Sequence, residues 1–467
     1  MKWIKLFFAK QYIAIVLGST FLLCFCNLPS GKDGLKNAPY DVTKYVDPFI
    51  GTGSHGHVFL GANVPFGAVQ LGPVNISEGW DWCSGYNYAD STIMGFSHTH
   101  LSGTGIGDLG DISFMPVVGN VLLERGVAAK PASGFYSLFS HSEEKAVPGY
   151  YAVHLKRYDI KAELTATERV GFHQYTFPAS DSAKIIIDLT NGIGWDGPVE
   201  TFIREVNDTT VTGFRFSKGW AADQRIFFTA IFSKAIKHFS VYDSTILKAG
   251  DSLHTKKIMA TALFSTVKDE KIKVKVGISP VSIDNAMKNI QAEIPLWDFE
   301  AIASKANMAW NNELNKIRVV SSDTARLRTF YTALYHTMIA PSIYDDHNGD
   351  YRGTDKKIYS KTSFTNLTTF SLWDTYRAAH PLFTIFQAGR VNDISVAEAA
   401  AAPAAGREFA VARKLREPSR TQRKTKRPNR PRASTGVRAC EASFKPSSFP
   451  LCCSLGNNHV PCAMPMN

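Results

Sequence analysis

The chain has 467 residues, of which 44% are hydrophobic and 12% aromatic, a composition that indicates a soluble globular protein of two or three domains. Its formal charge of +11 is concentrated in residues 388–467, where 14 Lys and Arg face 5 Asp and Glu, so that residues 1–387 carry only +2. This balance excludes a polyanion-binding role for the body of the chain, and we expect no nucleic-acid partner there.

Residues 1–26 have the pattern of an export signal. Three lysines in the first ten residues precede an apolar run over residues 12–26, which is short for a spanning helix and typical of a signal-peptide core. Cys24 and Cys26 each follow residues similar to a bacterial lipoprotein cleavage site, although the small residue usual before the lipidated cysteine is missing. We expect export, with membrane anchoring through a lipidated Cys24 or Cys26 left open.

Residues 43–280 predict an antiparallel β-sandwich. Residues 271–276 alternate perfectly between polar and apolar, which is the pattern of a strand with one wet face. Residues 183–189 and 225–232 are more continuously apolar and suit inner strands. Many short strands without long intervening helices favour a large sandwich.

The period changes to that of helices after residue 280, which predicts a helical linker over residues 281–320. A helix begins near Ile283, and Pro295 interrupts the helical pattern. The next helix is predicted from one apolar stripe, whose members are Phe299, Ile302, Ala306, Trp310, Leu314 and Ile317. Asp323 is expected to cap a further helix that ends before Pro341, and a third helical piece is expected after Leu372.

Residues 321–387 therefore start a helical domain, and residues 388–467 have a different composition. An alanine-rich run over 399–405 is followed by Lys, Arg and Pro over residues 413–432, which cannot bury enough apolar surface to offset the ordering entropy. We expect a disordered basic tail. Its change in Arg usage is typical of a shifted reading frame or an assembly error, and the alternative is a basic arm that binds a polyanion.

An aromatic cluster near residue 80 predicts a sugar site. Trp80, Trp82, Tyr86 and Tyr88 lie beside Asp81 in sequence, and sugar sites combine aromatic faces with carboxylates that bind hydroxyls. Taken alone, such aromatics are more often plain core. Cys83 is expected to be a small buried residue and not a nucleophile, because no histidine lies beside it in sequence.

Two histidine pairs, His55 with His57 and His98 with His100, have a spacing of two that could supply metal ligands. No cysteine or third ligand follows at a recognisable spacing, so hydrogen-bonding histidines that line a polar site are preferred over zinc. The glycine-rich segment Gly103–Asp111 lacks the basic end of a phosphate loop, and a loop that approaches another surface closely fits better.

Two later motifs are weaker. Residues 346–350 resemble the start of a calcium loop, but Tyr351 and Lys357 occupy the positions that need Gly and Glu, so a turn is preferred. Trp373, Asp374 and Arg377 lie within a turn and a half, where Asp374 and Arg377 alone could form a helix ion pair.

Six motifs in order strongly resemble glycoside hydrolase family 92, a family of exo-acting α-mannosidases, many specific for α-1,2 links, that is common in glycan-degrading Bacteroidetes. They are Tyr45–Gly53, Gly56–His57, Pro65–Gly67, Gly79–Tyr86, Phe96–Gly105 and Ser371–Arg377. The resemblance runs from about Val42 to Gln387.

The resemblance implies a β-sandwich, a helical linker and an (α/α)6 barrel, of which residues 321–387 would be a truncated start. It implies an inverting, calcium-dependent mechanism in which a general acid protonates the leaving oxygen and a base carboxylate, about 6.5 to 9.5 Å away, activates water. The family's calcium site lies largely in the barrel, so the metal ligands in this chain stay unknown.

Carried over by motif, the substrate-binding residues are Trp80, Asp81 and Trp82 from the sandwich with Trp373, Asp374 and Arg377 from the later segment. The catalytic Glu and Asp of the family lie further along the barrel, in segments that residues 388–467 do not match. Four glutamates of that segment stand in unrelated sequence and are not expected to substitute for them, namely Glu398, Glu408, Glu417 and Glu441.

The resulting hypothesis is an exported α-mannosidase for mannose-containing glycans, truncated and inactive as this chain, in the periplasm or on the outer-membrane surface of a Gram-negative bacterium. The alternative is a non-catalytic mannoside-binding envelope lipoprotein. A third hypothesis is polyanion binding through residues 413–432.

Overall fold

The structure is a computed structural model that describes residues 40–130, 133–370 and 375–399. The expected export signal at 1–26, both Trp373 and Asp374, and the basic residues 413–432 lie outside the described residues. Within the described ranges, no helix combines the length and apolar character needed to cross a membrane.

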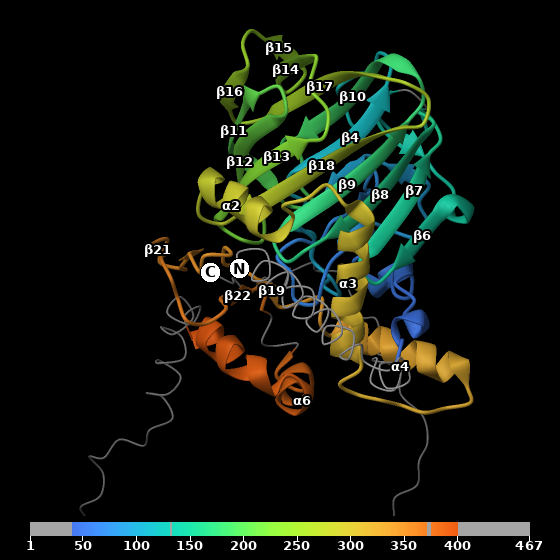
Figure 1. The fold of residues 1–467 in the computed structure, drawn as a ribbon, viewed down its shortest axis with the longest axis vertical. Helices are drawn as coiled ribbons and strands as arrows, with labels where there is room; N and C mark the ends of the chain where they lie inside the picture. The colour runs from blue at the N-terminus through green and yellow to red at the C-terminus, as the bar shows by residue number, and fades with distance from the viewer. Residues whose placement is uncertain (1–39, 131–132, 371–374, 400–467) are drawn as a thin grey trace, which may run out of the picture. The chain divides into compact units, whose positions relative to one another are not determined.

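Two antiparallel sheets make up the β-rich part of the chain (Figure 1). The seven-stranded sheet has the order β1 (Gly72–Val74), β3 (Gly95–Ser97), β4 (Ser113–Val118), β10 (Ser180–Asp188), β17 (Ile258–Thr266), β14 (His238–Asp243) and β15 (Ile246–Lys248). The nine-stranded sheet has the order β16 (Ser252–Thr255), β11 (Gly197–Asn207), β12 (Thr210–Lys218), β13 (Gln224–Phe232), β18 (Glu270–Ser279), β9 (Val170–Phe177), β8 (Ile160–Ala166), β7 (Tyr150–Leu155) and β6 (Glu144–Val147).

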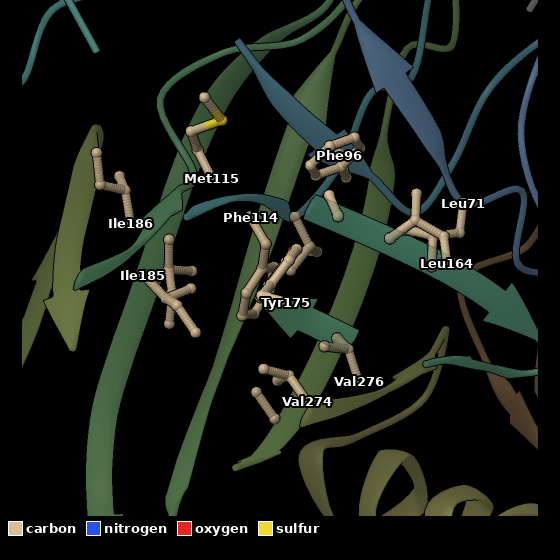
Figure 2. Packing of buried hydrophobic residues seen from close by; sticks show 14 of the residues in the cluster. Leu71, Phe96, Phe114, Met115, Leu164, Tyr175, Ile185, Ile186, Val274 and Val276 are labelled. Atoms are coloured by element: carbon tan, nitrogen blue, oxygen red, sulfur yellow. The ribbon is translucent and has the colours of Figure 1, made fainter. Parts of the chain in front are cut away.

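The main core lies between these sheets. Phe114 of β4 and Ile185 of β10 point toward Tyr175 of β9 and Val274 of β18, and all four side chains are fully buried (Figure 2). Facing sheets bury the inward half of each alternating strand, which is the packing of a sandwich. The predicted antiparallel β-sandwich is confirmed.

The alternation over residues 271–276 predicted the buried residues of the inner face correctly, but one residue of the outer face is buried instead of exposed. Ile272, Val274 and Val276 are buried as expected, but Lys275 is buried as well, with its ammonium 4.1 Å from the ring centre of Trp297. The chain after α2 (Ile283–Glu293) covers this part of β18, and burial lowers the pKa of Lys275 to about 8.

The linker helices follow their sequence signals closely. Ser282 caps α2 by accepting a hydrogen bond from the Asn285 backbone N–H, at 3.1 Å. Asp298 caps α3 (Phe299–Leu314), and the stripe expected from Phe299 to Leu314 is the buried face of that helix. Asp323 caps α4 (Thr324–His336), which ends earlier than the predicted limit at Pro341.

A second core joins the helices to the N-terminal segment. Val42, Val46, Phe59 and Phe66 pack with Trp310 of α3 and with residues of α4. The segment that carries η1 (Thr43–Tyr45), drawn in blue, lies against these two helices in Figure 1. Residues at the start of the predicted sandwich domain therefore pack against the helical linker and anchor the loops that follow.

Short elements complete the described chain. They are η2 (Ser54–Gly56), η3 (Trp80–Trp82), η4 (His141–Glu143), β2 (Thr92–Ile93) with β5 (Ser137–Leu138), β19 (Ser342–Ile343) with β22 (Leu367–Thr368), β20 (Tyr351–Arg352) with β21 (Ile358–Tyr359), α6 (Ala379–Phe386) and η5 (Ala388–Arg390). Residues 391–399 are helical, and Ile394 and Ala397 are buried in the second core. Folded chain thus continues beyond Gln387, where the disordered tail was expected to begin.

Candidate functional site

Three loops meet beside the sandwich and bring the sequence-predicted aromatic cluster together with one histidine pair. They carry η2, η3 and the glycine-rich segment that starts at Gly103. The backbone N–H of Gly103 donates to the His57 carbonyl at 2.8 Å, and the Phe59 N–H donates to Ser102 Oγ at 3.2 Å. These bonds fix the glycine-rich loop against the loop that carries η2.

Trp80 is an exposed aromatic platform that is held in place. Its side chain is 57% exposed, while the indole N–H donates to the Gly105 carbonyl at 2.7 Å. The ring meets His57 edge to face at a centroid distance of 4.4 Å. A Cβ at Gly105 would lie 3.3 Å from the Trp80 ring, so the glycine permits this close packing. A fixed, solvent-facing indole can stack on a sugar ring without losing much conformational entropy.

Asp81 places a carboxylate next to that platform. Its Oδ1 accepts from His55 Nδ1 at 2.6 Å and from His57 Nε2 at 3.3 Å. The hydrogen bond from His55 is the main cause that lowers the pKa of Asp81, and His57 adds to it. Asp81 is therefore an ionised acceptor at neutral pH.

Trp82 has a more structural position than Trp80. It is half-buried, and its indole N–H donates to Asp90 Oδ2 at 2.9 Å. The other oxygen of Asp90 accepts from the backbone and hydroxyl of Thr92. Trp82 also lines a small pocket together with Asn75, Ser77 and Arg125.

Cys83 supports the same turn. It is a free, buried thiol whose Sγ donates to the Trp80 carbonyl at 2.6 Å. Burial raises its pKa, which disfavours the thiolate that a nucleophile would need. The prediction of a small buried residue is confirmed.

The glycine-rich loop approaches a second surface, as predicted. A Cβ on Gly107 would lie 2.7 Å from the Gly194 Cα, so only glycine lets the two backbones meet. On the far side, the Trp195 N–H donates to the Gly107 carbonyl at 3.2 Å. Trp195 is exposed and stacks on Trp220 at 5.9 Å.

Sequence reasoning missed this second tryptophan pair. Trp195 lies among three glycines, Gly192, Gly194 and Gly197, a signal that could have been noticed, but nothing in the sequence links it to Trp220 or to the Gly103–Gly107 loop. A fully buried ion pair stabilises the base of the loops, in which Arg215 bridges Asp111 and Asp196. Burial raises the pKa of Asp196 to about 6.

The other predicted substrate-binding residues belong to the later segment, of which Arg377 lies in the described ranges. Trp373 and Asp374 lie outside the described residues, so their predicted contacts stay predictions. Arg377 is exposed, and its Nε donates to the Tyr376 hydroxyl at 2.7 Å. The calcium-like segment is a turn, in which the Gly349 N–H donates to the Asp346 carbonyl at 2.8 Å. Asp346 itself accepts from Ser279, Asn285 and Asn289.

Within the described ranges, one cluster of at least three metal-ligating side chains is present, formed by His55, His57 and Asp81 with ligand atoms within 4.8 Å of one another. Calcium takes six to eight oxygen ligands. Two imidazoles and one carboxylate do not fit that preference, so this cluster is not the calcium site implied by the resemblance.

Two family models match the chain in consecutive segments. The glycosyl hydrolase family 92 N-terminal domain matches residues 45–279, and the glycosyl hydrolase family 92 catalytic domain matches residues 285–405. The second match passes the expected limit at Gln387 and includes Glu398, so the expectation that Glu398 stands outside the family sequence is wrong.

Solved structures agree with the family models. An α-mannosidase of family GH92 from Bacteroides thetaiotaomicron is 40% identical, with a TM-score of 0.74 over 77% of this chain and 50% of that chain. Its complex with mannoimidazole also gives a TM-score of 0.74, over 76% and 48%. A family GH92 inverting mannosidase from Bacteroides thetaiotaomicron VPI-5482 is 27% identical, with a TM-score of 0.65 over 74% and 46%.

A curated relative comes from Arthroderma benhamiae and is described as an uncharacterized secreted glycosidase. It is 29% identical over 372 residues, which are 72% of this chain and 45% of that protein. The chain therefore spans about half the length of the relatives that it matches.

Proposed function

The chain belongs to glycoside hydrolase family 92, and on that premise we propose that its loops around Trp80 form part of a binding site for α-linked mannose in glycans. The observation that carries the proposal is the Trp80 indole, which is 57% exposed and is fixed by Gly105 and His57. The family relationship changes the interpretation of this cluster from core aromatics to sugar contacts.

The chemistry of the loops suits a sugar. The apolar C–H face of a mannose ring stacks on an indole, and the ionised Asp81 can accept hydrogen bonds from the hydroxyls of the same ring. Trp82 contributes through the wall of the small pocket that it lines and not through its N–H, which Asp90 already accepts.

In the proposed reaction, the full site is inverting and exo-acting, with a preference for α-1,2-mannosides. Trp373, Asp374 and Arg377 contact the terminal mannose, while a general acid and a base carboxylate act on opposite faces of the ring. Calcium is the proposed cofactor of the complete family site. The lowered pKa of Asp81 makes this carboxylate unsuited to the role of the general acid, which must hold a proton.

We further propose that residues 1–467 alone do not hydrolyse mannosides. Outside the family match, Glu408, Glu417 and Glu441 stand among Arg, Pro and Ser residues that resemble no catalytic segment. Glu398 lies inside the match, but its presence there assigns it no role. Turnover of α-1,2-mannobiose by the purified chain at a normal enzyme rate would contradict this part of the proposal.

Calorimetric titration with α-1,2-mannobiose tests sugar binding separately from hydrolysis. We expect millimolar binding, and we expect Trp80→Ala to weaken it about tenfold, equivalent to about 1.4 kcal/mol of stacking. Trp297→Ala is the matched control, because Trp297 packs over Lys275 and not at the loops. Absence of binding at millimolar ligand, or equal loss in both variants, would count against the site.

The alternative is a non-catalytic mannoside-binding envelope lipoprotein. It is favoured by the exposed and fixed Trp80 indole, which can bind a sugar ring without catalysing its hydrolysis. Both versions place the protein outside the cytoplasm, in the periplasm or on the outer-membrane surface. Radiolabelled palmitate incorporation that disappears in a Cys24→Ala, Cys26→Ala double variant would support the lipoprotein, whereas no incorporation in the parent chain would exclude lipidation.

A further inference from the structure

The fold gives the first histidine pair the third ligand that the sequence did not reveal. His55 Nδ1 and His57 Nε2 both point at Asp81 Oδ1, at 2.6 and 3.3 Å. Asp81 is 24 residues beyond His57 in the chain, and η3 returns it to η2. Within the described residues, the ion-pair partners of Asp81 are these two histidines.

The ligand atoms have a composition that selects among metals. Two imidazole nitrogens and a carboxylate oxygen suit zinc and related divalent transition metals, whereas calcium and magnesium prefer oxygen ligands. The ligand set of two histidines and one carboxylate also leaves a fourth position for water or another ligand in tetrahedral zinc.

The geometry needs only a small adjustment. Ligands at about 2.0 to 2.2 Å from a tetrahedral zinc ion lie about 3.3 to 3.5 Å from one another. The His57–Asp81 separation of 3.3 Å already matches, and the three ligand atoms lie within 4.8 Å. His55 must move back from Asp81, and its side chain is 70% exposed and free to do so.

The burial of the three side chains gives the cluster a fixed inner end and an adjustable outer end. His57 is 4% exposed, Asp81 29% and His55 70%. His57 has a left-handed backbone, with φ 51°, and its carbonyl accepts from Gly103 at 2.8 Å. Its imidazole is therefore held in place before any metal arrives, which reduces the entropy lost on binding.

We propose that His55, His57 and Asp81 bind one zinc-class divalent cation, at a site distinct from the family's calcium. The ion replaces the two histidine hydrogen bonds to Asp81 and cross-links η2 to η3. Because His57 and Asp81 flank Trp80, the ion also restricts the motion of the aromatic platform.

Zinc titration of the full chain by calorimetry tests the site, after the thiols are alkylated in every sample. Alkylation is needed because the thiols outside the described residues could bind zinc elsewhere, namely those of Cys24, Cys26, Cys440, Cys452, Cys453 and Cys462. We expect one site of micromolar affinity, and we expect His57→Ala and Asp81→Asn each to weaken it roughly 100-fold.

His154→Ala is the control, since this histidine also pairs with two carboxylates, Glu143 and Asp159, at the surface but lies far along the chain on β7. The affinity of the His154→Ala variant for zinc should equal that of the parent chain. Circular dichroism checks that each variant is folded. Zinc binding that is absent in the parent chain, or unchanged in both His57→Ala and Asp81→Asn, overturns the proposal.

Cobalt and calcium give a second, independent measurement. Co²⁺ bound by the parent chain should show the intense visible absorption of four-coordinate cobalt. Ca²⁺ at equal concentration should not displace the cobalt, so the absorption should remain. Displacement by calcium would identify an oxygen-rich site elsewhere and contradict the assignment. Neither experiment depends on mannose binding, so the proposal stands or fails separately from the sugar site.

Discussion

The two histidine pairs have the same spacing in sequence and opposite surroundings in the fold. His55 and His57 lie on a loop and converge on Asp81, with His55 largely exposed. His98 and His100 are fully enclosed between the sheets and the neighbouring loops. A spacing of two can place both side chains of a pair on one face. The residues from other segments that contact the pair then decide whether its histidines are available to bind a ligand.

The buried pair has its tautomers fixed by its hydrogen bonds. His98 Nδ1 lies 2.6 Å from the Ile112 carbonyl, which can only accept, so His98 Nε2 must accept from His173 Nε2 at 3.0 Å. His173 Nδ1 in turn accepts from the Tyr175 hydroxyl at 2.8 Å. His98 and His173 are therefore neutral, and each uses both ring nitrogens in hydrogen bonds. His100 Nδ1 donates to the Gln70 carbonyl at 2.8 Å, while its buried Nε2 has no hydrogen-bond partner among the described residues.

Removing a buried histidine should have the largest effect. His98→Ala leaves a cavity and deprives both His173 and the Ile112 carbonyl of a partner, so we expect the free energy of unfolding to fall by about 3 to 5 kcal/mol. Urea denaturation measures this. A loss below about 1 kcal/mol would mean that His98 contributes no more to the free energy of unfolding than an exposed histidine does, which would contradict its placement in the core.

Much of the fold could be predicted from sequence because its signals are local. The stripe from Phe299 to Leu314 and the caps at Ser282, Asp298 and Asp323 depend on residues within one turn. The errors come from distant packing. Lys275 is buried because the chain around Trp297 folds back over β18, and residues 388–399 are ordered because Ile394 and Ala397 reach the second core.

The candidate site was predictable only in part for the same reason. Trp80 and Asp81 stand out as an aromatic beside a carboxylate, and the family resemblance gives that pattern a function. The meeting of Asp81 with His55 and His57 requires η3 to return to η2, which no local period reports. Trp195 with Trp220 is a similar case, since each lies in a different loop.

The second-largest effect is expected from acid, which should destabilise the folded protein through the buried pair His98 and His100. Burial lowers the pKa of His98 and of His100 to about 4, while the unfolded chain has histidines near 6.5. The unfolded state therefore binds more protons between these values, so stability that is present above pH 6.5 is lost as the pH falls toward 4. At pH 4.5 each of the two histidine rings, His98 and His100, should lower the free energy of unfolding by roughly 2 to 3 kcal/mol.

Urea denaturation at pH 7 and pH 4.5 tests this loss, with His100→Phe as the informative variant. Phenylalanine keeps the ring packing against Phe59 and cannot take up a proton, so the difference between the two pH values should shrink by the contribution of one ring. An unchanged difference would show that His100 is already accessible to protons in the folded state.

The smallest effect is expected from the exposed member of the other pair. His55→Ala removes one surface hydrogen bond to Asp81, and surface pairs contribute little, so the melting temperature should change by less than about 2 °C. The same variant should nevertheless lose most of the response of the melting temperature to zinc. A ligand that binds only the folded state raises the melting temperature, because it stabilises by RT ln(1 + [L]/Kd).

Thermal melts of alkylated parent chain and His55→Ala, each with and without zinc, separate these two roles of His55. The parent chain should gain several degrees with zinc at about 100 times the dissociation constant, and the variant should gain much less. Equal gains would show that zinc binds without His55, which would leave the exposed pair as a hydrogen-bonded surface feature. In that case the two pairs would differ in burial alone and not in their capacity to hold a metal.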